Sequence, residues 1–287
     1  MATAPARPAT TASAAPIARP ASAPARQASA PARPAQTAPV PAVPAKPRTP
    51  SDRTPSGISG LDELINGGLE KESTTLVMGD AGCGKTTFLA QFLHNGAMQY
   101  NEPSVLLSFE EPSTSIIKHM GRYGLDFAEL EKQGLFASIN YRPHEVKKLV
   151  DEGGGLIWDT ISSIGAKRLA IDSLTSYAML FESLYQAREA ELLLFELLHK
   201  WKCTTLLSAE GINTEKMRIT TGMEYLSDGV ILLHHPRYQS GRYRAIEILK
   251  MRGCKHSEKL CPYEFVDGEG IRVYPGETIF YDVTTME

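Results

Sequence analysis

Cysteine and tryptophan are scarce in this 287-residue chain, which has four cysteines and two tryptophans, and long apolar runs are absent. The cysteines, Cys83, Cys203, Cys254 and Cys261, are widely separated and do not suggest a disulfide framework. Cys254 and Cys261 with His256 match no common zinc-binding spacing, so we expect no zinc site. No run of 18 apolar residues occurs and no apolar segment opens the chain. We therefore predict neither a membrane helix nor a secretory signal, and we expect a soluble, cytoplasmic protein.

The first 50 residues contain no aspartate, glutamate or aromatic side chain. They hold 12 of the 19 prolines, together with many alanines and six basic residues. Such a composition cannot bury enough apolar surface to offset the entropy lost on ordering, and its prolines disfavour the amphipathic helix of a transit peptide. We expect residues 1–50 to be a disordered, Ala/Pro-rich tail with a polyproline II bias, and residues 51–287 to form one compact domain.

Charge is divided unevenly between these two parts. Residues 1–50 carry a net charge of +6, whereas residues 51–287 have 24 basic and 33 acidic residues and a net charge of −9. The tail could touch acidic surfaces or nucleic acid weakly, although a solvated spacer is the favoured interpretation. The acidic domain matches nucleic acid poorly, because phosphate backbones bind basic surfaces.

The motif around which the chain is organised, GDAGCGKTT, fits G-x-x-x-x-G-K-[ST] without a mismatch. An apolar run at 74–78 typical of a buried strand precedes it, and apolar residues at helical spacing follow it over 87–93. In a strand, glycine loop and helix of this kind, backbone N–H groups and the helix N-terminus surround a triphosphate. Lys85 would reach the β- and γ-phosphates, and the Thr86 hydroxyl would bind Mg²⁺. The predicted nucleotide-binding residues are Gly79, Asp80, Ala81, Gly82, Cys83, Gly84, Lys85, Thr86 and Thr87.

Apolar runs and helical periodicity alternate along the rest of the domain. We predict strands over 72–79, 104–111, 135–141, 167–173, 204–209, 230–233 and 243–251, and a closing hairpin over 263–274. We predict helices within 51–68 and over 85–98, 112–120, 125–133, 145–150, 156–164 and 187–201. Strands alternate with helices early and pair antiparallel late. The sequence therefore predicts an α/β fold whose sheet is parallel in its centre and antiparallel at its edge.

Acidic side chains follow two of these strands. Asp172 ends an apolar strand and can hold Mg²⁺ directly or through water, although an ordinary turn acid is the alternative. Glu110 and Glu111 end the strand at 104–111, and ATP hydrolysis needs a carboxylate that orients water in line with the γ-phosphate. Adjacent side chains point in opposite directions unless the strand has already ended, and we predict Glu110 as the catalytic base with Glu111 in support. Acids at the start of a helix after Pro112 are the alternative explanation.

Two cations, Lys250 and Arg252, lie at the end of the strand at 243–251. They share one face, because side chains on a strand repeat every two residues. Paired cations at a strand end suit a phosphate supplied by a neighbouring molecule, and a solvated edge guarded by charge is the alternative.

Over roughly residues 54–275 the chain resembles a single-domain member of the KaiC-like branch of the RecA superfamily. The resemblance is carried by SGISGLDELINGGL, GDAGCGKTT, LLSFEEP, RLAIDSLTSY, LSDGVILL and ILKMRGCKH. It implies a RecA-like P-loop domain that binds and hydrolyses ATP with Mg²⁺. It also implies a homo-oligomer, a hexameric ring with ATP between subunits, and a regulatory or signalling role that involves protein partners.

The same resemblance implies roles for individual residues. Glu110 and Glu111 match the catalytic carboxylate pair, Asp172 matches the second acid of the metal site, and Lys85 acts at the phosphates. Arg122 falls where the family contacts the base. The positions that match contacts to the nucleotide of the adjacent subunit are Lys250, Met251, Arg252, His256 and Asp267.

The chain also departs from the family pattern. The autophosphorylating domain of the family carries a Ser-Thr pair just before the strand that begins here near Leu226, whereas this chain has Glu224 and Tyr225. The chain is therefore more similar to the family's hydrolytic domain, and autokinase activity at these positions is not expected. Cys254 stands where the family often has threonine, and the Ala/Pro-rich tail has no counterpart.

Alternative functions share the same core. The paired carboxylates and paired cations favour a ring ATPase. A RecA/RadA-like DNA-repair ATPase would need basic or aromatic central loops, but the candidate loop at 211–222 has only Lys216 and Arg218 as cations. An ATP-sensing regulator with little turnover would not need the carboxylates. A protein kinase remains open, because the same site can deliver phosphate to a hydroxyl group.

We predict that deleting residues 1–50 leaves the thermal unfolding midpoint almost unchanged, because a tail without acidic or aromatic residues contributes no core. Calorimetry of the full-length and shortened chains measures this. A large drop in the midpoint would show that the tail packs on the domain.

Overall fold

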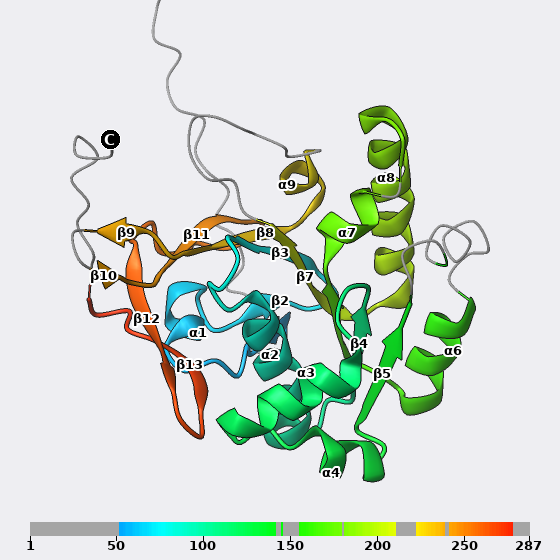
Figure 1. Cartoon of the computed structure of the whole chain (residues 1–287), viewed down its shortest axis with the longest axis horizontal. Coiled ribbons are helices and arrows are strands. Elements are labelled where there is room, and N and C mark those ends of the chain that lie inside the picture. Colours follow the sequence, from blue (N-terminus) through cyan, green and yellow to red (C-terminus); the bar gives the residue numbers. More distant parts are fainter. Residues whose placement is uncertain are drawn as a thin grey trace, which may run out of the picture. The chain divides into compact units, whose positions relative to one another are not determined.

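The apolar runs of the sequence form one nine-stranded sheet in the computed structural model, which describes residues 52–141, 145, 155–179, 181–210, 222–238 and 241–277 (Figure 1). The strand order across the sheet is β13-β12-β11-β8-β3-β7-β6-β4-β5. These strands are β3 (Thr74–Gly79), β4 (Ser104–Ser108), β5 (Phe136–Asn140), β6 (Arg168–Asp172), β7 (Thr204–Glu210), β8 (Gly229–His234), β11 (Ala245–Met251), β12 (Cys261–Val266) and β13 (Gly270–Val273).

Six neighbouring strands, from β8 to β5, are parallel, whereas β11, β12 and β13 continue the sheet antiparallel from β8. The central strands β3, β4 and β6 are buried along their whole length, which explains their continuous apolar runs. The predicted α/β fold, with a parallel centre and an antiparallel edge, is confirmed.

Helices cover both faces of the sheet (Figure 1). Side chains on alternate sides of β3 show the division, since Val77 packs with one cluster of buried residues and Leu76 with the other. The first cluster contains residues of α1 (Leu61–Leu64), α2 (Lys85–Tyr100), α3 (Ser113–Met120) and α4 (Phe127–Lys132). The second contains residues of α6 (Gly155–Ile164), α7 (Leu174–Ala178), α8 (Leu184–Trp201) and α9 (Met223–Leu226). In the part of the chain described, no helix is long and apolar enough to cross a membrane.

The structure corrects several boundaries. The strand predicted over 104–111 ends at Ser108, and the chain then turns into α3. The helix predicted within 51–68 is only the single turn α1. The short elements that were not predicted are the ribbons β1 (Arg53–Thr54) with β2 (Leu69–Glu70) and β9 (Arg237–Tyr238) with β10 (Gly241–Arg242), the helices α7 and α9, and a 3₁₀ turn at Gly121–Tyr123.

Three sequence predictions fall outside the described residues. They are the tail at 1–50, nearly all of the helix at 145–150, and nearly all of the loop at 211–222.

A buried arginine joins α2 to the start of β6. Arg168 is fully buried, and its Nε donates to Glu102 Oε2 at 2.7 Å while its Nη1 donates to the Phe92 carbonyl at 2.9 Å. Its guanidinium also stacks over the Phe92 ring at 4.6 Å. Gly96 of α2 makes room for it, because a Cβ there would lie 2.2 Å from Arg168 Nε. Alanine would normally suit a helix interior better than glycine, so this position is explained by the arginine.

We predict that Gly96→Ala lowers the free energy of unfolding by about 2 kcal/mol, because the added methyl group displaces the buried guanidinium. The control is Gly121→Ala, since a Cβ at Gly121 meets no atom within 4 Å and its φ of −56° suits alanine. Urea unfolding of both variants measures the difference. Equal stability of the two variants would contradict this account of Gly96.

Candidate nucleotide site

The glycine loop joins the end of β3 to the start of α2. Gly82 and Gly84 have φ values of 80° and 103°, which turn successive backbone N–H groups inward and favour glycine. Lys85, the first residue of α2, is folded back over the loop, where its Nζ donates to the carbonyls of Gly79 at 2.7 Å and Asp80 at 3.2 Å. The loop thus has the form of an anion-binding turn with its lysine already at the centre.

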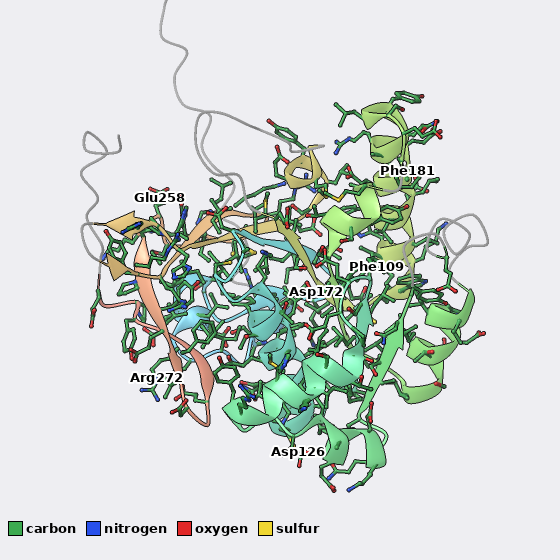
Figure 2. All side chains as sticks on the ribbon, in the orientation of Figure 1. Phe109, Asp126, Asp172, Phe181, Glu258 and Arg272 are labelled. Carbon is green, nitrogen blue, oxygen red and sulfur yellow. The ribbon has the colours of Figure 1, made fainter. Side chains whose placement is uncertain are left out.

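Thr86 and Asp172 meet beside this loop. Thr86 Oγ1 donates to Asp172 Oδ2 at 2.7 Å, and Ser208 of β7 donates to Asp172 Oδ1. Burial raises the pKa of the Asp172 carboxyl, and the hydrogen bonds from Ser208 and Thr86 oppose this effect. Figure 2 shows Asp172 at the end of its strand near Phe109, whose backbone N–H donates to the Asp172 carbonyl at 2.7 Å. A hydroxyl and a carboxylate in direct contact fit Mg²⁺, which prefers oxygen ligands.

The two glutamates after β4 diverge. Glu110 Oε1 accepts hydrogen bonds from Ser173 Oγ at 2.6 Å and from Ser176 Oγ, so it faces the edge that carries Asp172. Glu111 instead accepts from Ser115 and lies 3.3 Å from His119 Nδ1, both on α3. Strand alternation does not explain this divergence, because β4 has already ended at Ser108. The turn that follows β4 directs the two carboxylates to different elements.

Lys250 and Arg252 lie together at the opposite end of the sheet. Lys250 Nζ donates to the carbonyls of Glu224 at 2.8 Å and Ser227 at 2.6 Å. Arg252 donates to the Tyr225 carbonyl at 2.9 Å and pairs with Asp228 at 3.3 Å.

Their distance from the glycine loop follows from the strand directions. Met251 pairs with Gly229 at the start of β8, and Asp228 N donates to the Thr74 carbonyl at the start of β3. The glycine loop follows Gly79, at the other end of β3. Six residues of strand separate these ends by about 17 Å, which is beyond the reach of a lysine or arginine side chain.

The remaining predicted residues fall in two places. Arg122 precedes Tyr123, and the ring of Tyr123 stacks on Phe265 of β12 with 5.7 Å between the ring centroids. The segment that contains Arg122 therefore meets the β12–β13 hairpin, and the turn of this hairpin contains Asp267. Met251 is buried at the end of β11. His256 follows in the connection to β12, where the next residue donates its N–H to the Leu64 carbonyl of α1. The structure therefore places the segments of Arg122 and Asp267 beside each other and beside Phe265, and it keeps Met251 and the following connection with the distant cations.

Three residues beside the loop escaped the sequence analysis. Phe265 lies against Gly84, since a Cβ on that glycine would be 2.5 Å from its ring. The Arg244 guanidinium stacks over Phe265 at 4.7 Å, and its buried Nε has no hydrogen-bond partner in the described part of the chain. Burial and the neighbouring Arg244 and Arg242 lower the pKa of His235, while Asp80 of the loop opposes the shift. No sequence signal marks these residues, because each lies far downstream of the loop, after β8, before β11 or on β12, and the packing of these strands brings it there.

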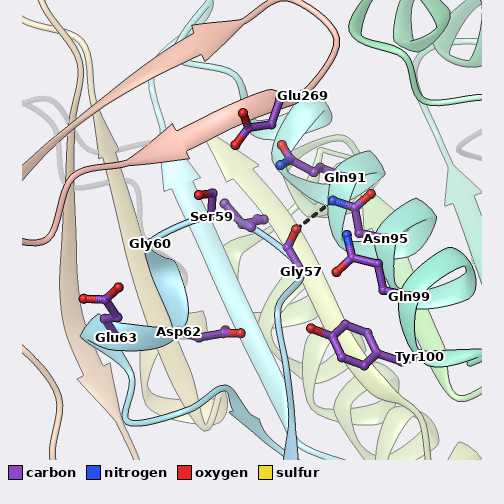
Figure 3. Close-up of a pocket in the computed structure, with 11 residues that line it drawn as sticks. Gly57, Ser59, Gly60, Asp62, Glu63, Gln91, Asn95, Gln99, Tyr100 and Glu269 are labelled. Carbon is purple, nitrogen blue, oxygen red and sulfur yellow. Dashed lines mark hydrogen bonds between the residues drawn. The ribbon is translucent and has the colours of Figure 1, made fainter.

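A separate pocket of about 340 Å³ flanks the distal half of α2 (Figure 3). Its polar lining includes the carboxylates of Asp62, Glu63 and Glu269 and the amide of Gln99. Asn95, which also lines it, donates from Nδ2 to the Gly57 carbonyl at 2.7 Å. The residues predicted to bind nucleotide are not among those that line it.

Comparisons with known proteins identify the family of the chain. The family model described as the KaiC ATPase matches residues 54–278. A UPF0273 protein from Methanocaldococcus jannaschii is 32% identical over 244 residues, which cover 79% of this chain and 98% of the relative. The circadian clock oscillator protein KaiC from Prochlorococcus marinus is 33% identical over 229 residues, which cover 77% of this chain and 46% of the relative. The chain thus spans about half of the clock protein and nearly all of the UPF0273 protein.

A solved structure is also similar. The KaiC-like protein from the hyperthermophilic archaeon Pyrococcus horikoshii OT3 superposes with a TM-score of 0.69 and is 36% identical, covering 78% of this chain and 99% of its own. The region that the family model matches, residues 54–278, contains the glycine loop, Asp172, Lys250 and Arg252. The chain belongs to the KaiC-like ATPases of the RecA superfamily.

Proposed function

We propose that residues 51–287 bind and hydrolyse ATP with Mg²⁺, and that residues 1–50 form an appended tail. The proposal rests on the hydrogen bond between Thr86 and Asp172 beside the glycine loop. Glu110 lies at the same edge of the sheet. Phosphate binding, metal binding and water activation each need a group at this edge, and the chain supplies one for each.

Each residue has a defined task in this proposal. The backbone N–H groups of the glycine loop bind the phosphates, and Lys85 exchanges its two carbonyl acceptors for the β- and γ-phosphate oxygens. Thr86 and Asp172 hold the Mg²⁺ ion, which supplies positive charge at the phosphates when bound. Glu110 orients a water whose oxygen bonds to the γ-phosphorus while the bond to the β-phosphate oxygen breaks. The water proton passes to Glu110 Oε2, and ADP leaves.

The cations Lys250 and Arg252 act on the nucleotide of a neighbouring subunit. The length of β3 lies between them and their own glycine loop, so contact with a phosphate requires a second copy. Such a contact joins different surfaces of the two copies, and repeated contacts of this kind close into a ring. Burial and the adjacent Arg252 lower the pKa of Lys250, as expected for cations held together until an anion reaches them.

The role of such a ring is regulatory, with turnover that sets partner-binding states in the cytoplasm. The sequence motifs and the clock-protein relatives support this role over DNA repair. The domain's net charge of −9 also disfavours nucleic acid as a partner. Glu110 on the site edge favours hydrolysis over simple ATP sensing.

We predict that Lys85→Ala weakens ATP binding by about 10- to 100-fold, because a charge-assisted hydrogen bond to phosphate is lost. Equilibrium binding of a fluorescent ATP analogue, with Lys71→Ala as a control at an exposed lysine, measures this. Unchanged affinity would remove the glycine loop from the proposed site.

We predict that Arg252→Ala lowers hydrolysis by about 100-fold or more while ATP binding changes little, because an arginine supplied in trans stabilises charge in the transition state. Glu110→Gln should be equally inactive. Co-expression of the two variants should restore about a quarter of the wild-type rate, because some sites combine an intact Glu110 with a neighbour's intact Arg252. A mixture no more active than its separate components would mean that Arg252 does not act in trans.

A further inference from the structure

Two serine hydroxyls hold one oxygen of Glu110. Ser173 Oγ lies 2.6 Å from Glu110 Oε1, and Ser176 Oγ donates to the same oxygen. Glu110 Oε2 makes no hydrogen bond to the described residues. One oxygen of the carboxylate is therefore anchored, and the other is left to accept from a molecule outside the chain.

Because the Ser173 hydroxyl binds Glu110, it does not cap the helix that it precedes. Ser173 is the N-cap residue of α7, where a serine hydroxyl usually accepts a hydrogen bond from a backbone N–H of the first turn. Here it makes no such bond and donates to Glu110 instead. The stability of helix α7 does not explain the position of the Ser173 hydroxyl, whereas a role in fixing the Glu110 carboxylate does.

Hydrogen bonds also hold helix α7 to strand β7 and to helix α8. Thr175 Oγ1 accepts from the backbone N–H of Glu210 at the end of β7 at 2.8 Å. Tyr177 donates from its hydroxyl to the Ala190 carbonyl of α8 at 3.1 Å, and its ring is fully buried beside Phe109. Ser176 lies between these two residues, so its position is set by β7 and α8 and not by its own single turn of helix.

We infer that Ser176 is a positioning residue for hydrolysis: together with Ser173 it holds Glu110 Oε1 so that Oε2 faces the attacking water. This inference rests on the proposed function, in which Glu110 Oε2 takes the water proton. A carboxylate on a turn after a strand has free rotamers, and two anchors on one oxygen remove that freedom before ATP arrives. Ser176 is the better residue to test, because it is partly exposed while Ser173 is buried next to Asp172.

The test compares Ser176→Ala, Ser176→Thr and a control, Ser163→Ala, in the full-length protein. Ser163 is an exposed helical serine whose hydroxyl donates to the Thr160 carbonyl within its own helix, so it reports the general cost of removing such a group. We expect Ser176→Ala to lower kcat by about tenfold, the loss typical of one hydrogen bond to a charged group, with KM for ATP and the unfolding midpoint unchanged. Threonine should restore most of the rate, and Ser163→Ala should match wild type.

A second comparison separates positioning from a structural effect. In a Glu110→Gln background, Ser176→Ala should change the residual rate by less than about twofold, because the group that it positions is already lost. An equal loss in both backgrounds, or a loss confined to KM or stability, would overturn the inference.

Failure of the inference can be told from failure of the proposed function. If wild type does not hydrolyse ATP with Mg²⁺, or if Glu110→Gln keeps the wild-type rate, the proposed hydrolysis or the role of Glu110 is wrong and the inference falls with it. If Glu110→Gln is inactive but Ser176→Ala matches Ser163→Ala, the role of Ser176 alone is wrong.

Discussion

The hydrogen bonds on both sides of β3 are the constraint on which the site depends. β3 pairs in parallel with β7 and with β8 along its length, so its end cannot move independently of theirs. The glycine loop begins where this pairing stops, and parallel strands bring Asp172, Ser208 and Glu110 to the same edge. Because ligands of open α/β sheets bind at the carboxyl ends of the strands, the sheet places the groups before any side chain contributes.

Hydroxyl groups dominate this edge. Thr86 and Ser208 bond to Asp172, and Ser173 and Ser176 bond to Glu110. A hydroxyl can stabilise a buried carboxylate without neutralising it, whereas an arginine would form an ion pair that a metal could displace only at high cost. Among the described residues no ion pair forms at either acid. In the proposed site, Asp172 would therefore be available to a metal ion and Glu110 to a water molecule.

Local patterns predicted most of the architecture and named residues that the fold brings together at one edge of the sheet. The glycine loop and Asp172 could be placed from the sequence because each lies within a few residues of an apolar strand that locates it. Glu110 was also predicted to be at this edge, but its serine partners were not, since Ser173 and Ser176 belong to a short helical segment without periodicity. Arg244 and Phe265 were missed for a different reason: their place beside Gly84 depends on how the distant strands β11 and β12 pack, which no local pattern records.

Strand β11 links the two regions to which the proposed function assigns a role. Arg244 immediately precedes its first residue, beside the glycine loop, and Lys250 and Arg252 lie at its far end, with a register shift between Ile248 and Lys250. In the proposed ring, one end of this strand lies beside its own subunit's glycine loop, while the other end contacts the next subunit's nucleotide. A shift of the strand along its axis would then couple the two nucleotide sites. A conformational change on hydrolysis would therefore be passed in one direction around the ring. Each subunit would affect the neighbour that its cations contact and not the other neighbour.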